Sequence, residues 1–108
     1  MGKIKKFVLD TAEFHPLHKA WLKLAKRLAE EYGVDLEIRK EDYMYAIEHG
    51  KTDDLGMAAL PQLFAELEDG SIKLVLGEYP FDPATTKPDE TMAYEQAKKA
   101  VEDILKDP

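Results

Sequence analysis

Cysteine is absent from this chain of 108 residues, and its absence excludes several kinds of chemistry. Without thiols the protein has no disulfide, no thiolate metal ligand and no cysteine nucleophile. Asparagine is also absent, and Ser71 is the only serine. Few labile amides combined with many Lys and Glu residues are typical of proteins from thermophiles.

Long apolar runs and excess positive charge are missing as well. No stretch approaches the roughly 20 apolar residues that cross a bilayer, and no signal-peptide pattern opens the chain, so we expect a cytoplasmic protein. The net charge of -7 would repel nucleic-acid phosphates and anionic membranes, which excludes both as expected partners. A hydrophobic content of 44% predicts one globular domain over residues 1–108.

The first part of the chain alternates between strand and helix patterns. Ile4–Leu9 is a nearly continuous apolar run, typical of a strand that is covered on both faces. Pro16 suits the first position of a helix, and apolar residues at helical spacing continue to Tyr32. Gly33 is suited to end that helix. Apolar and charged residues then alternate and predict a second strand, with Val34, Leu36 and Ile38 on one face.

The second part of the chain predicts a hairpin between two helices. Residues 40–50 predict a short helix, and residues 51–60 an irregular segment with a turn. Asp69-Gly70 is a strong hairpin signal between two alternating runs, which are Leu63, Ala65 and Leu67, then Ile72, Leu74 and Leu76. Residues 77–88 contain three prolines and predict a loop, and a last helix follows. The order β-α-β-α-β-β-α predicts an α/β domain whose four-stranded mixed sheet is flanked by helices.

This order resembles the thioredoxin-like fold over Lys3–Leu105. The segment "GMAALPQLF", Gly56–Phe64, resembles the stretch that leads into the third strand of that family. The resemblance implies that Pro61 follows a cis peptide bond and faces the family's active site, with Leu60 before it.

In redox-active members of the family, the loop between the first strand and the first helix carries Cys-Pro-x-Cys. The matching residues here are His15-Pro16-Leu17-His18, so the proline is kept and both cysteines are replaced by histidine. The resemblance therefore implies a fold and the location of a site, but the absence of thiols excludes thiol–disulfide exchange.

The leading hypothesis is a redox-inactive thioredoxin-like module that binds a protein, a peptide or a second copy of itself. The family's substrate groove lies between the start of the first helix and the cis-proline loop. The resemblance places seven residues of this chain there: Phe14, His15, Pro16, Leu17, His18, Leu60 and Pro61. An extended segment could pair with the backbone beside Pro61, a form of β-augmentation.

Two other hypotheses concern the same residues. His15 and His18 are three residues apart, so on a helix both rings could reach one Zn²⁺ or other divalent ion, with Asp10 and Glu13 as further ligands, or one ring could assist an enzymatic reaction. A zinc site needs three or four protein ligands, so a histidine pair alone is a weak signal. The third hypothesis is a structural subunit whose two histidines are ordinary surface residues.

The aromatic pair in the proline-rich loop has two interpretations. Tyr79 and Phe81 would form a partner-binding patch if they are exposed, and would cap the end of the sheet if they are buried.

Overall fold

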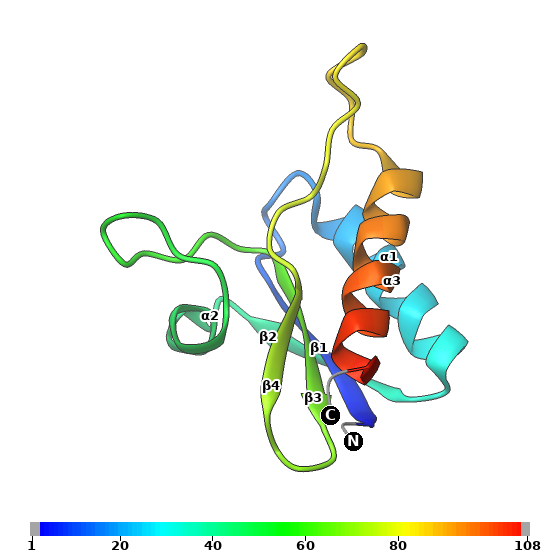
Figure 1. The fold of residues 1–108 in the computed structure, drawn as a ribbon. Coiled ribbons are helices and arrows are strands. Elements are labelled where there is room, and N and C mark those ends of the chain that lie inside the picture. The colour runs from blue at the N-terminus through cyan, green and yellow to red at the C-terminus, as the bar shows by residue number, and fades with distance from the viewer. Residues whose placement is uncertain (1–2, 107–108) are drawn as a thin grey trace.

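The computed structural model describes residues 3–106, and it has the predicted element order. The strands and helices are β1 (Ile4–Thr11), α1 (His18–Tyr32), β2 (Asp35–Lys40), α2 (Tyr43–His49), β3 (Gln62–Leu67), β4 (Ile72–Leu76) and α3 (Glu90–Lys106). The four-stranded sheet has the order β2-β1-β3-β4, with β1 parallel to β2 and antiparallel to β3. Helices α1 and α3 cover one face and α2 lies over part of the other (Figure 1). The chain is therefore an α/β domain with a mixed sheet.

Helix α1 begins two residues later than the sequence predicts. Pro16 was expected at its first position, but the first helical residue is His18. The His15 ring explains the difference, because its Nδ1 accepts a hydrogen bond of 3.0 Å from the backbone N–H of Leu17 and stabilises a separate turn before the helix. The other end agrees with prediction: Gly33 has a φ of 66° and donates its N–H to the carbonyls of Ala29 and Glu30.

The main core lies between the sheet and the helices α1 and α3. Its fully buried side chains come from the sheet and both helices, and they are Phe7, Leu9, Trp21, Ala25, Leu28, Leu63, Ala65, Ala93, Ala97 and Val101. The helix positions recur at the spacing of one helical face, as the sequence predicts. Figure 1 shows both helices lying along this face of the sheet. Burial of Trp21 confirms that it belongs to the core.

A smaller apolar cluster lies on the opposite face, under α2. It consists of Val8, Ala46, Ala58, Leu60 and Phe64. The predicted alternation of Ile72, Leu74 and Leu76 on one face is wrong. The pairing of β3 with β4 shifts in register between Leu63 and Phe64, and this shift changes the face of the sheet to which the later β4 side chains point. Ile72 and Leu74 therefore pack on the small cluster, while Leu76 joins the main core.

The loop between β4 and α3 is ordered by its own hydrogen bonds. Asp82 donates its N–H to the Lys87 carbonyl at 2.8 Å, and Phe81 forms a β-bridge with Pro88. The loop rises beyond the sheet at the end where α1 begins (Figure 1). Its two aromatic residues differ: Tyr79 is buried edge-on against Trp21, with ring centroids 5.5 Å apart, whereas Phe81 is 49% exposed. Tyr79 is therefore buried, and a partner-binding patch stays a prediction for Phe81.

Candidate functional site

A groove opens at the end of the sheet between the start of α1, the proline loop and the segment after β4. Its volume is about 250 Å³, and the residues that line it are His15, Leu17, Trp21, Ala59, Leu60, Pro61, Gly77, Glu78, Tyr79 and Phe81. The peptide bond between Leu60 and Pro61 is cis, as the resemblance implies. The segment after β4 forms one wall of the groove and leaves it open.

The structure brings four of the seven predicted groove residues together. His15 and Leu17 line the groove from one side, and Leu60 and Pro61 from the other. The remaining three do not line it. Phe14 is 75% exposed and Pro16 is exposed on the loop, while the His18 ring is engaged with Thr11.

The two histidines are held by separate hydrogen bonds. His15 Nδ1 accepts from the Leu17 N–H, which places the proton of the neutral ring on Nε2. His18 Nδ1 lies 2.8 Å from the hydroxyl oxygen of Thr11, a fully buried residue. Both rings thus use Nδ1 for the local structure of this loop, and no hydrogen bond within residues 3–106 uses either Nε2.

The oxygen ligands suggested for a metal site are used elsewhere. The Asp10 side chain accepts from the backbone of Asp42 on the α2 face of the sheet, and Glu13 forms an ion pair with Lys40. Among residues 3–106, no group of three or more His, Asp or Glu side chains is placed to hold one ion. A metal site at His15 and His18 stays a prediction without a third protein ligand.

A second cavity of about 270 Å³ adjoins the groove, and the sequence did not predict it. It is lined by Lys51, Thr52, Asp53, Met57, Ala58, Ala59, Gln62, Gly77 and Glu78. Ala59, Gly77 and Glu78 line both hollows. We call this second hollow the Met57 pocket. The available signal was the presence of Leu55 and Met57, two large apolar residues, in a segment that has no helix or strand pattern.

The wall of the Met57 pocket is held by the buried side chain of Gln62. Its Oε1 accepts from the Lys51 N–H at 2.8 Å, and its Nε2 donates to the carbonyls of Lys51 and Ala59 at 3.0 and 2.8 Å. Gly50 permits this approach, because a Cβ atom there would collide with the Gln62 amide. The Gln62 side chain thus holds Lys51 and Ala59, the two ends of the segment 51–59, against β3.

Asp53 stabilises the turn within the same segment. Its Oδ1 accepts from the N–H groups of Leu55 and Met57 at 2.9 and 3.0 Å. The Asp53 N–H in turn donates to the Met57 carbonyl at 2.9 Å. Loops whose backbone is fixed in this way lose less conformational entropy when they bind a ligand.

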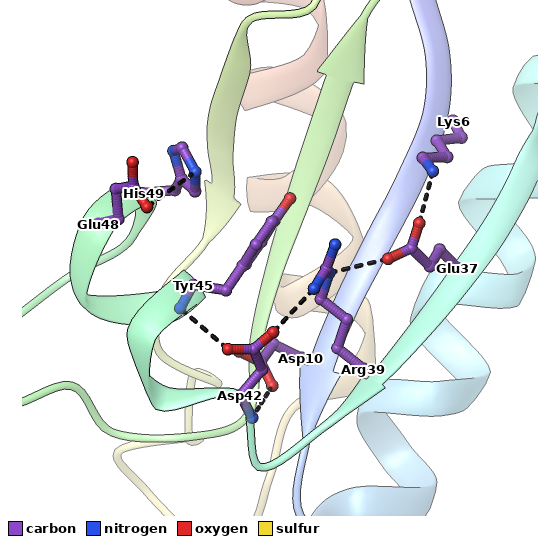
Figure 2. A network of polar contacts seen from close by, with 8 residues as sticks. All are labelled: Lys6, Asp10, Glu37, Arg39, Asp42, Tyr45, Glu48 and His49. Atoms are coloured by element: carbon purple, nitrogen blue, oxygen red, sulfur yellow. Dashed lines mark hydrogen bonds and ion pairs between the residues drawn. The ribbon is translucent and has the colours of Figure 1, made fainter.

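A chain of charged side chains crosses the face of the sheet that α2 partly covers (Figure 2). Glu37 on β2 forms ion pairs with Lys6 and Arg39, and Arg39 reaches Asp42 at 2.7 Å. The Arg39 guanidinium also lies 4.3 Å from the centre of the Tyr45 ring. Because Asp42 is the N-cap of α2, this network attaches the helix to the edge of the sheet.

Asp10 is the buried member of this region. Its Oδ1 accepts a 3.0 Å hydrogen bond from the Asp42 N–H, and its Oδ2 has no hydrogen-bond partner among the described residues. Burial raises the pKa of the Asp10 carboxyl to about 6. The cavities do not include Asp10, so its place is beneath α2 rather than in the groove.

Comparisons with protein-family models, with curated proteins and with solved structures find no match to this chain. Within residues 3–106, no helix combines the length and the apolar character that crossing a bilayer requires.

Proposed function

We propose that this chain is a thioredoxin-like domain that binds an extended segment of another protein in the groove between α1 and the Leu60–Pro61 loop. The element order and the sheet order β2-β1-β3-β4 support the thioredoxin-like assignment, as does the position of His15-Pro16-Leu17-His18 between β1 and α1. Since the chain has no cysteine, the domain acts by binding and not by thiol–disulfide exchange.

The observation that carries this proposal is the open groove with its apolar lining. Leu17, Leu60 and Tyr79 contribute apolar surface, and the exposed ring of Phe81 lies at the groove. Apolar clefts with a few polar groups are typical of binding sites.

The backbone beside the groove also suits an extended ligand. No hydrogen bond within residues 3–106 uses the N–H or carbonyl of Leu60, the residue before Pro61. Free backbone groups at the edge of a hollow can pair with an extended peptide, whose side chains then enter the adjacent pockets.

The test is selection of binders from a random peptide library, followed by obstruction of the groove. Ala59 is an exposed residue that lines it, so Ala59→Phe fills the space with little effect on the core. Leu60 is a poorer probe because its side chain packs in the cluster under α2. The matched control is Ala84→Phe, at an exposed alanine that does not line the groove.

We expect selected peptides to bind the wild type and the Ala84→Phe variant, and to lose most of their affinity for Ala59→Phe. Thermal unfolding of both variants checks that they are folded. Equal affinity for all three proteins would contradict the proposal by placing the binding site outside the groove. A library that yields no binder would also contradict it and would favour a structural subunit.

A further inference from the structure

The groove and the Met57 pocket share the lining residues Ala59, Gly77 and Glu78, and we call the two hollows together the recess. The groove contains Leu17 and Trp21, which pack with the core under α1 and α3. The Met57 pocket contains Ala58, from the cluster under α2. Because the two hollows have lining residues in common, a ligand in the groove would lie next to the Met57 pocket.

Gly77 allows the chain after β4 to approach Lys51 closely. A Cβ atom at this position would lie 3.1 Å from the Lys51 Cβ and 3.4 Å from the Leu74 Cδ2, and the first of these contacts is closer than ordinary packing allows. Because Lys51 and Gly77 both line the Met57 pocket, a side chain at position 77 would disturb this part of the pocket wall.

The size and lining of the Met57 pocket indicate what it holds. Its volume of about 270 Å³ is below the roughly 300–1,000 Å³ of sites for drug-sized molecules, so it suits a single large side chain. Met57 lines the pocket and is 57% exposed, and an exposed apolar side chain at a pocket is typical of a contact surface. The occupant should therefore be apolar.

The acidic residues of the recess lie at the Met57 pocket. Asp53 and Glu78 line the pocket, and the exposed Asp54 follows Asp53 in the sequence. We call these three residues the acidic rim. Lys51 also lines the pocket, but it is paired with Glu78 at 3.1 Å, so these two charges largely compensate each other.

We propose that the recess binds a protein segment in which one large apolar residue is flanked by Lys or Arg, and that the apolar side chain enters the Met57 pocket. This inference rests on the proposed function and names the chemistry of its ligand. The apolar side chain supplies affinity through burial, and the acidic rim orients the cationic flanks and speeds association.

The experiment compares peptides that share one selected binding core but differ in their flanks, which are lysine, serine or glutamate. Dissociation constants are measured for the wild type at about 0.1 M and about 1 M salt, where the Debye length falls from about 10 to about 3 Å. We expect the lysine peptide to bind about tenfold more tightly than the glutamate peptide at low salt, and the difference to shrink at high salt.

A pair of double variants distinguishes the effect of the acidic rim on peptide binding from the effect of the net charge of the protein. Asp54→Lys with Glu78→Lys reverses two charges of the rim, and both positions are exposed. Glu30→Lys with Glu102→Lys makes the same change in net charge near the C-terminal ends of α1 and α3, away from the recess. We expect the first pair to remove the preference for lysine flanks and the second to preserve it.

The possible results distinguish this inference from the function on which it rests. Equal binding of the lysine and glutamate peptides, or equal effects of both double variants, would overturn the inference and leave the binding function in place. Failure of every peptide to bind would overturn both.

Discussion

The face of the sheet under α1 and α3 is closed by apolar side chains, whereas the face under α2 combines a small apolar cluster with ion pairs and a buried carboxylate. Helix α2 has only seven residues and covers part of its face, and Figure 1 shows the segment between α2 and β3 extending away from the sheet. One face thus provides most of the stability, while the other supports the segment that forms the Met57 pocket. This difference predicts that stability and binding can be changed separately.

The largest effect on stability should come from the helix-covered face. Leu28 on α1 is fully buried in the main core. Leu28→Ala should lower the free energy of unfolding by about 2–5 kcal/mol, because it removes apolar contacts and leaves a cavity. Denaturant titration measures the loss. At a temperature where the variant is folded, peptide affinity should match the wild type, and a large loss of affinity would mean that the two faces are coupled.

A smaller loss of stability, with a larger loss of binding, should follow from Gln62→Leu. The substitution removes three hydrogen bonds to Lys51 and Ala59, and we expect it to cost about 1–3 kcal/mol. Because these bonds hold the wall of the Met57 pocket, peptide affinity should fall even where the protein is folded. Amide hydrogen exchange should accelerate in residues 51–59. Unchanged exchange and affinity would show that the segment does not depend on this side chain.

The smallest effect should be a gain in stability from Asp10→Asn. Burial raises the pKa of Asp10 in the folded state to about 6, above its ordinary value of 3.8, so the folded protein binds more protons than the unfolded chain between about pH 4 and pH 6. The contribution of Asp10 to stability therefore falls as the pH rises through this window. Since Asn is neutral, the variant should be more stable at pH 7 by about 1–2 kcal/mol, less than the full pKa shift implies because its amide lacks one partner.

Unfolding measured at pH 4 and at pH 7 tests this prediction. The gain from Asp10→Asn should be present at pH 7 and smaller at pH 4, where wild-type Asp10 is protonated. A variant that is less stable at both values would indicate that the carboxylate is stabilised by its bond from the Asp42 N–H more than it is destabilised by burial.

Much of the fold could be predicted from the sequence because it depends on local patterns. The stripe from Leu17 to Tyr32 and the Asp69-Gly70 turn each specify their own structure, and their order limits the topology. The start of α1 could not be predicted in this way. The hydrogen bond from the Leu17 N–H to the His15 ring stabilises a separate turn that includes Pro16, so the helix begins only at His18. The face of Leu76 depends on a register shift between two strands, which no periodicity within one strand reveals.

The candidate site was predicted in part for a related reason. His15, Leu17, Leu60 and Pro61 were placed in the groove by resemblance, and the structure puts them around one hollow. The Met57 pocket depends on contacts between residues far apart in the sequence, such as Gln62 with Lys51 and Gly77 with Lys51. These contacts form only when the chain folds, so the pattern of residues 51–59 by itself indicates no more than a turn.

The most direct test of the recess as the binding site is amide chemical-shift mapping with a selected peptide. We expect the largest shifts at Leu17, Ala59, Gly77 and Glu78, which border the groove or the Met57 pocket. Shifts concentrated instead on Glu37, Arg39 and the other charged residues of the α2 face would contradict it.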